Sequence, residues 1–192
     1  PCRDPHRCAD RCAYRVVEGR AIQGPFLSSG ASGARQAVLH DFTNPQNWRT
    51  LVRIKLELGD ELGIRAVLNE LFTILGRDPE ALSQLDGISM VQSGSAILEA
   101  SLVADPLDAD EWWSSISDSE EAFGDFVERL SKLDLSDPRA NVLFSRRLER
   151  IRDSGREEEY LELSRIILAQ SPSNHEAWSE LGRMHERRGD YD

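Results

Sequence analysis

The stretch 174–192 reads NHEAWSELGRMHERRGDYD and begins shortly after a proline. A proline cannot continue a helix, so a new helix is expected to start here. Trp178, Leu181 and Gly182 lie in that helix, and the Gly-Asp-Tyr at 189–191 is a turn signal that ends it. The stretch therefore predicts an amphipathic helix between a break and a turn.

Similar breaks recur along the chain. Five prolines, each preceded by Asn, Asp or Ser, are separated by 34, 27, 32 and 34 residues; they are Pro45, Pro79, Pro106, Pro138 and Pro172. The small polar residue before each proline can cap the helix that follows. A bulky apolar residue stands six positions after four of them: Leu85, Trp112, Phe144 and Trp178. Regular breaks with one bulky residue at a constant phase predict a stacked helical repeat array.

The last units resemble the tetratricopeptide (TPR) repeat family. The family pattern W-x2-L-G-x2-Y is met by Trp178, Leu181 and Gly182, with His185 at the usual tyrosine. The preceding unit, 141–174, has the family's length and differs from its pattern in the second helix. The resemblance is most specific in this C-terminal part of the chain.

The resemblance extends in weaker form to residue 44 and is strongest over 141–192. It implies an all-α fold, a right-handed α-solenoid of antiparallel helix pairs over 44–192, after an irregular N-terminal segment at 1–43. Because the last unit stops at its turn, before a second helix, we expect the chain to be truncated at its C-terminus.

Several local features are expected within this array. Trp178 is expected to pack in the core with Leu181 and Ile167. A turn is expected at each of two places, Gly59-Asp60 and Gly94-Ser95. A capping box is expected to open a helix within unit 107–138, with Ser117 and Glu120 as its two members.

The N-terminal segment differs from the rest in composition. It holds all three cysteines, in the pattern C-x3-H-x-C-x3-C formed by Cys2, His6, Cys8 and Cys12. Four such ligands could hold a tetrahedral zinc ion, or the cysteines could be reduced and pack as small apolar side chains. We expect no cofactor and a reducing, cytoplasmic location. The glycine- and serine-rich residues 24–34 predict a linker, and 34–42 a short helix.

Charge and hydropathy exclude several classes of function. The chain has 34 acidic against 23 basic residues, a net charge of -11, which argues against a nucleic-acid-binding protein. No apolar run approaches the length of about 18 residues that a membrane span needs. No nucleophile, metalloprotease or calcium-loop pattern is present, so no catalytic residue is predicted within this fragment.

The TPR resemblance implies a non-enzymatic scaffold or adaptor that binds a protein or peptide in a concave groove. First-helix positions of the family then give the partner-binding residues Arg49, Arg53, Trp113, Arg146, Arg183 and Arg187. Guanidinium groups favour an acidic or phosphorylated peptide. Alternatively, these arginines are solvated and pair with the nearby acids Glu57, Glu149, Asp153, Glu180 and Glu186.

Two other functions stay open from the sequence. The array could be the partner-binding arm of a larger enzyme whose catalytic domain lies outside this fragment. It could also be an RNA-processing array of the HAT type, if the arginines cluster in space despite the acidic net charge.

Overall fold

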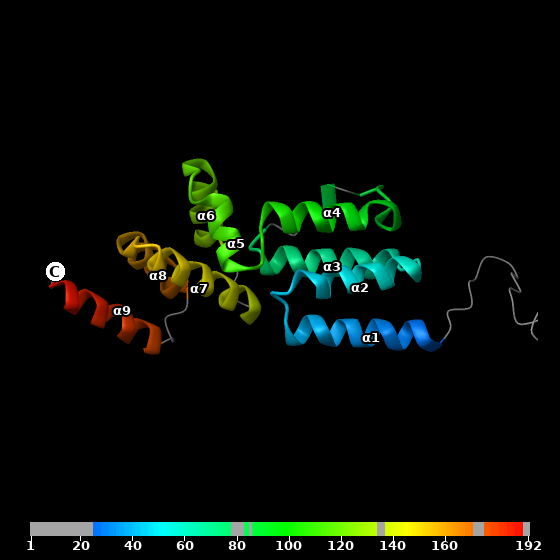
Figure 1. The fold of residues 1–192 in the computed structure, drawn as a ribbon, viewed down its shortest axis with the longest axis horizontal. Helices are drawn as coiled ribbons and strands as arrows, with labels where there is room; N and C mark the ends of the chain where they lie inside the picture. The colour runs from blue at the N-terminus through cyan, green and yellow to red at the C-terminus, as the bar shows by residue number, and fades with distance from the viewer. Residues whose placement is uncertain (1–24, 78–82, 85, 134–136, 171–174, 190–192) are drawn as a thin grey trace, which may run out of the picture.

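The computed structural model describes residues 25–77, 83–84, 86–133, 137–170 and 175–189. These residues form nine helices and no strand (Figure 1). The helices are α1 (Pro25–His40), α2 (Pro45–Glu57), α3 (Glu61–Ile74), α4 (Met90–Ala104), α5 (Ala109–Ile116), α6 (Glu120–Ser131), α7 (Pro138–Asp153), α8 (Glu157–Gln170) and α9 (His175–Arg188). The predicted all-α class is confirmed for the described part of the chain. None of its helices is long and apolar enough to cross a bilayer.

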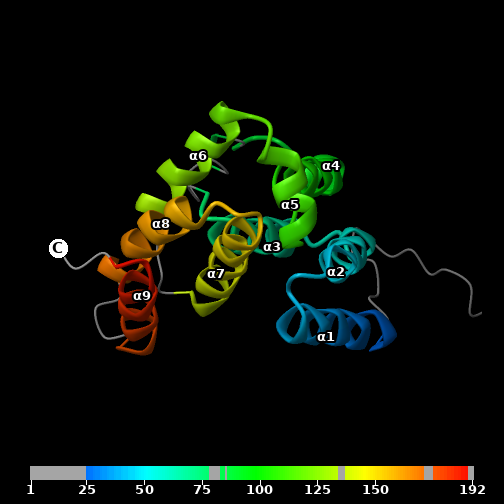
Figure 2. The ribbon, with the colours of Figure 1, turned by 60° about the vertical axis from the view of Figure 1, so that its left-hand side comes forward.

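Most helices contact their neighbours in the sequence. α2 packs on α1 and α3, α3 on α4, and α8 on α7 and α9. A second set of contacts joins helices that are two apart: α2 with α4, α5 with α7, and α6 with α8. α1 to α4 form one end of the molecule and α6 to α9 the other, and α3 also contacts α7 across the middle (Figures 1 and 2).

Two of the five spaced prolines mark helix starts as expected, whereas Pro106 lies three residues before the start of α5. Pro45 and Pro138 are the first residues of α2 and α7. The side chain of Asn44 caps α2 by accepting from the backbone N–H of Gln46 at 3.0 Å, and Asp137 caps α7 in the same way. Both interactions satisfy a helix N–H that would otherwise lack a partner.

The predicted glycine turn between α2 and α3 is confirmed. Gly59 has φ +62°, a left-handed conformation that glycine adopts without steric cost. Asp60 then caps α3 by accepting from the N–H of Gly63 at 2.8 Å. Gly155, with φ +89°, makes the corresponding turn between α7 and α8.

The turn predicted at Gly94-Ser95 is wrong, because both residues lie inside α4. A Cβ atom on Gly94 would lie 2.5 Å from Cγ2 of Ile64, which is buried in α3. The glycine therefore allows α3 and α4 to approach closely, as a packing residue and not as a turn.

The capping residue predicted for α6 was two positions off. Ser119 caps α6 by accepting from the N–H of Ala122 at 3.2 Å, whereas Ser117 ends α5. α6 therefore starts at Glu120, directly after its cap, and residues 117–119 connect it to α5.

The linker predicted at 24–34 is also wrong over its described residues, because α1 starts at Pro25 and continues to His40. The helix packs on α2, with Ala34 and Val38 buried and Gly30 beside Ile54. Packing on a neighbouring helix has outweighed the weak helix propensity of glycine and serine.

Aromatic side chains form the centre of the core. Trp112, Phe126 and Phe144 pack in a row, with ring centroids 4.6 Å and 5.6 Å apart. They come from α5, α6 and α7. Trp112 and Phe144 are the bulky residues that the proline spacing indicated, and Phe126 joins them from α6. Trp48 is fully buried in α2, and its Nε1–H donates to the carbonyl of Phe42 at 2.7 Å.

The packing predicted for Trp178 is wrong, since its side chain is 39% exposed. Leu181 is buried in a small cluster with Leu161, Leu168 and Met184, whereas Ile167 belongs to the main core. α9 therefore contacts α8 through Leu181 and Met184, and Trp178, one turn earlier, stays outside that cluster.

Candidate functional site

Arg49, the first predicted partner-binding residue, links two helices. Its Nε and Nη2 donate to the two carboxylate oxygens of Glu99 on α4, at 2.8 and 2.9 Å. This hydrogen-bonded ion pair raises the pKa of Arg49 and lowers the pKa of Glu99. The pairing acid is fifty residues away along the chain, so it is not the sequence-adjacent Glu57 that the alternative interpretation proposed.

Arg53 and Arg146 present exposed guanidinium groups. Arg53 makes no ion pair with a described residue. Arg146 lies 3.5 Å from the hydroxyl of Thr43, which precedes α2, and has no carboxylate partner in the described ranges. α7 thus places a free cation beside the start of α2.

The other predicted positions lie elsewhere. Arg183 and Arg187 are exposed on α9, at the opposite end of the molecule from α2 (Figures 1 and 2). Trp113 is only 8% exposed and packs edge-on against Phe123, with the guanidinium of Arg156 5.2 Å from its ring centroid. Trp113 is therefore a core residue, and the prediction that it lines an open groove is wrong.

Three links bring α2, α5 and α7 to one surface. Arg146 of α7 reaches Thr43 before α2, and Arg150 of α7 pairs with Asp110 of α5. The third link is electrostatic, because Glu111 of α5 is close enough to raise the pKa of Arg49. We call this surface, formed by Arg49 of α2, Asp110 and Glu111 of α5, and Arg146 and Arg150 of α7, the α2–α7 surface; we include Arg53, which lies one helical turn after Arg49 on α2.

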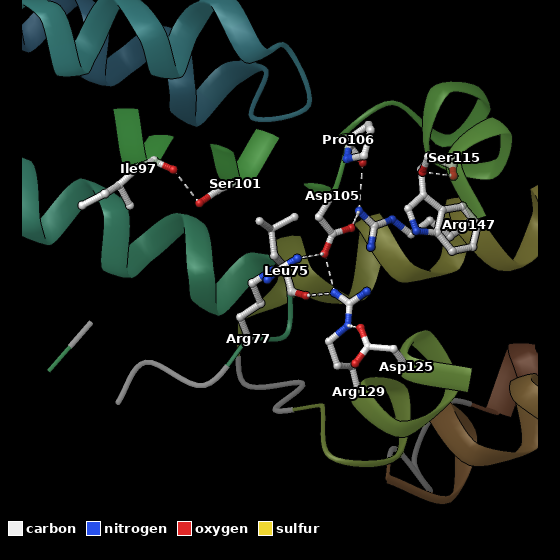
Figure 3. A network of polar contacts seen from close by, with 11 residues as sticks. Leu75, Arg77, Ile97, Ser101, Asp105, Pro106, Ser115, Asp125, Arg129 and Arg147 are labelled. Carbon is white, nitrogen blue, oxygen red and sulfur yellow. Dashed lines mark hydrogen bonds and ion pairs between the residues drawn. The ribbon is translucent and has the colours of Figure 1, made fainter. Parts of the chain in front are cut away.

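The two buried charged residues of the described part of the chain, Asp105 and Arg147, lie elsewhere. Asp105 ends α4, is 1% exposed, and is contacted by three guanidinium groups (Figure 3). Arg77 follows α3, Arg129 belongs to α6 and Arg147 to α7. We call these four residues the Asp105 cluster; they join four helices through one carboxylate.

Arg147 is the deepest member of the cluster. It is fully buried, its Nη2 lies 2.8 Å from Asp105 Oδ1, and the same nitrogen donates to the carbonyl of Pro106 at 2.9 Å. Its guanidinium lies 5.0 Å from the ring centroid of Trp112 and 5.3 Å from that of Phe144. Burial, with some contribution from the neighbouring arginines, lowers the pKa of Arg147 to about 10.

The other two arginines reach the surface. The side chain of Arg129 is 17% exposed and contacts Asp105, and its Nη1 also donates to the carbonyl of Leu75 at 3.1 Å. Arg77 is 34% exposed, and its Nη2 lies 3.5 Å from Asp105 Oδ2. The cluster therefore runs from the core at Arg147 to solvent at Arg77.

Sequence reasoning missed this cluster. Asp105 precedes Pro106 and was interpreted as a helix cap, but the residue that caps α5 is Asp108, which accepts from the N–H groups of Asp110 and Glu111. A signal was present in α7, where Arg147 interrupts an apolar face that is otherwise buried. A buried arginine requires a buried acid, but the pattern does not say which one.

The described residues contain no group of three or more His, Cys, Asp or Glu side chains that could hold a metal ion. His40 and His175 are exposed at helix termini, and His185 lies 3.0 Å from Arg165. The candidate zinc ligands Cys2, His6, Cys8 and Cys12 lie outside the described residues.

Comparison of the chain with protein-family models, with curated proteins and with solved structures gives no match. The likeness to TPR repeats therefore stays a prediction. What the described residues establish is an all-helical fold with the Asp105 cluster at the junction of its helices.

Proposed function

We propose that this chain is a protein-interaction module, a TPR-like right-handed α-solenoid whose α2–α7 surface binds an acidic segment of a partner protein. The observation that carries the proposal is the pair of exposed arginines, Arg53 and Arg146, that lack a carboxylate partner among the described residues.

The order of helix contacts supports the architecture. In a stacked array of helix pairs, each helix contacts its partner and the equivalent helix of the next unit. The contacts of α5 with α7 and of α6 with α8 follow this order, as do those within the pairs α5–α6 and α7–α8. Such stacking leaves the first helices of successive units exposed along one side, where an extended or helical segment can bind.

The chemistry of the α2–α7 surface supports an acidic ligand. Arg49 is held in place by Glu99 and Arg150 by Asp110, so their charges are already compensated. Arg53 and Arg146 remain available for bidentate hydrogen bonds to carboxylate or phosphate groups. A cytoplasmic adaptor role belongs to the same proposal.

Peptide binding by two matched double variants tests the proposal. Acidic, phosphorylated and basic peptide pools are offered to the wild-type chain, to Arg53→Gln/Arg146→Gln and to Arg183→Gln/Arg187→Gln, with affinity measured by fluorescence anisotropy. Both variants remove two exposed positive charges. We expect a loss of affinity for acidic peptides of about a hundredfold or more in the first variant, because it loses two charge-assisted hydrogen bonds that each contribute about 1.5–3 kcal/mol, and little change in the second.

The matched variants are needed because the net charge of -11 opposes any acidic ligand at long range. Salt dependence alone would mix this repulsion with local attraction. Preference for basic peptides, or equal losses in the two double variants, would contradict binding at the α2–α7 surface.

A further inference from the structure

The Asp105 cluster has an excess of positive charge. Arg77, Arg129 and Arg147 share one buried carboxylate, which leaves a formal surplus of two positive charges. Among the described residues a second acid, Asp125, lies 3.3 Å from Arg129 Nε, but its side chain is 66% exposed and its charge is screened by solvent. Arg147 is fully buried and paired with Asp105, so the surplus falls on the partly exposed Arg77 and Arg129, where an anion from solvent can compensate it.

Several donors of the cluster are also left over. The Nε groups of Arg77 and Arg129, and both Nε and Nη1 of Arg147, are buried and make no hydrogen bond to a described residue. Arg147 is fully buried, so its two free donors face the interior of the protein and not bulk solvent. Unmet donors and unmet charge occur together on Arg77 and Arg129 (Figure 3).

We propose that Arg77 and Arg129, with Arg147 behind them paired to Asp105, form a binding site for a phosphate-type oxyanion, either free phosphate or a phosphoryl group of a partner. The anion would approach from the side where Arg77 and Arg129 are exposed and share their charges with Asp105. A phosphoryl group carries a charge of about -1.5 to -2 at pH 7, which matches the surplus of two positive charges. Planar guanidinium groups also suit its oxygens through bidentate hydrogen bonds.

This site is separate from the α2–α7 surface and does not depend on the proposed function. The α2–α7 surface uses exposed arginines of α2 and α7, whereas the Asp105 cluster opens beside the end of α3 and α6. Each can therefore be tested without the other.

The first test measures phosphate binding to the whole chain by calorimetry, and thermal unfolding in phosphate against chloride at equal ionic strength. We expect phosphate to raise the unfolding temperature more than chloride does. Arg77→Gln should weaken phosphate binding about tenfold, the loss of one charge-assisted hydrogen bond. The control is Arg150→Gln, whose side chain has a similar exposure of 32% against 34% but pairs with Asp110; its phosphate binding should not change.

The second test separates anion binding from a purely structural ion cluster. Asp105→Asn removes the carboxylate that competes with the anion, so this variant should be less stable than wild type in chloride but bind phosphate at least as tightly. Phosphate should then raise the unfolding temperature of Asp105→Asn by more than it raises the unfolding temperature of wild type. A structural cluster alone predicts the same destabilisation with no specific rescue.

A short, otherwise neutral phosphoserine peptide distinguishes the two sources of the anion. Binding of the peptide in competition with phosphate identifies a phosphoryl group on a partner, and binding of phosphate alone identifies the free ion; both results support the site. Equal effects of phosphate and chloride on wild type, or equal phosphate binding by Arg77→Gln and Arg150→Gln, would overturn it. The Arg77→Gln comparison decides the matter even if Asp105→Asn does not fold.

Discussion

Removing the carboxylate of the Asp105 cluster should be far more damaging than removing its most buried arginine. Asp105→Asn keeps the shape of the side chain and deletes its charge. Arg147→Met keeps most of the volume and apolar contact of the arginine and deletes its charge. Both changes remove the ion pair of 2.8 Å between the two residues, so a pairwise view predicts equal losses.

The structure predicts unequal losses. Asp105 is the only buried carboxylate that Arg77, Arg129 and Arg147 contact in the described part of the chain, so Asp105→Asn leaves three cations uncompensated. Breaking a buried ion pair in this way costs about 3–5 kcal/mol.

Arg147→Met leaves Asp105 with two arginine partners, Arg129 and Arg77. The carbonyl of Pro106 loses its donor, at a cost of about 1–3 kcal/mol if it stays unpaired. Relief of the buried positive charge and contact of the thioether with Trp112 offset this loss. We expect a net loss below about 1.5 kcal/mol, the usual limit for a volume-conserving replacement.

The assay is urea unfolding, followed by far-UV circular dichroism and by tryptophan fluorescence. The free energies of unfolding are compared only between proteins with the same dependence on urea concentration (the slope m). A change in the urea midpoint then reports a change in stability and not a change in the surface exposed on unfolding. Losses for Asp105→Asn and Arg147→Met that agree within about 1 kcal/mol would refute the charge argument, as would a larger loss for Arg147→Met.

Three further comparisons test packing and capping. Gly76 (φ +64°) and Gly59 (φ +62°) are both left-handed, so mutation of either to Ala introduces backbone strain of about 1–2 kcal/mol. A Cβ on Gly76 would also lie 2.9 Å from two core side chains. Gly76→Ala should therefore lower the free energy of unfolding in urea by about 1–3 kcal/mol more than Gly59→Ala does. Trp178→Ala should cost below about 1 kcal/mol, against about 3–5 kcal/mol for buried Trp48→Ala; equal losses in thermal unfolding would contradict the observed exposure. The carboxylate of Glu61 accepts from two N–H groups at the start of α4, which lowers its pKa below the ordinary 4.5. This stabilisation is therefore present above pH 4.5 and lost as the pH falls through the lowered pKa, so the stability difference between wild type and Glu61→Gln should close in acid titration.

The sequence by itself determined the helical class and many helix boundaries. Pro45 and Pro138 begin helices because a proline cannot continue one, and Gly59 makes the predicted turn because glycine adopts the left-handed conformation without steric cost. These rules act between residues a few positions apart, so they can be applied without knowing the fold. The bulky residue at Phe144 was expected in the core for a similar reason, since stacked units bury one side of each helix.

Tertiary structure alone decided which distant residues meet. Gly94 was interpreted as a turn, but the proximity of Ile64 makes it a packing residue. The surface expected to carry six partner-binding residues is divided, with Trp113 in the core. Arg147 and Asp105 are far apart in the chain and come together only when α4 and α7 pack. Propensity and capping depend on local backbone geometry, whereas the environment of a charge depends on every element packed against it, and for this reason the sequence showed the helices and the fold created the Asp105 cluster.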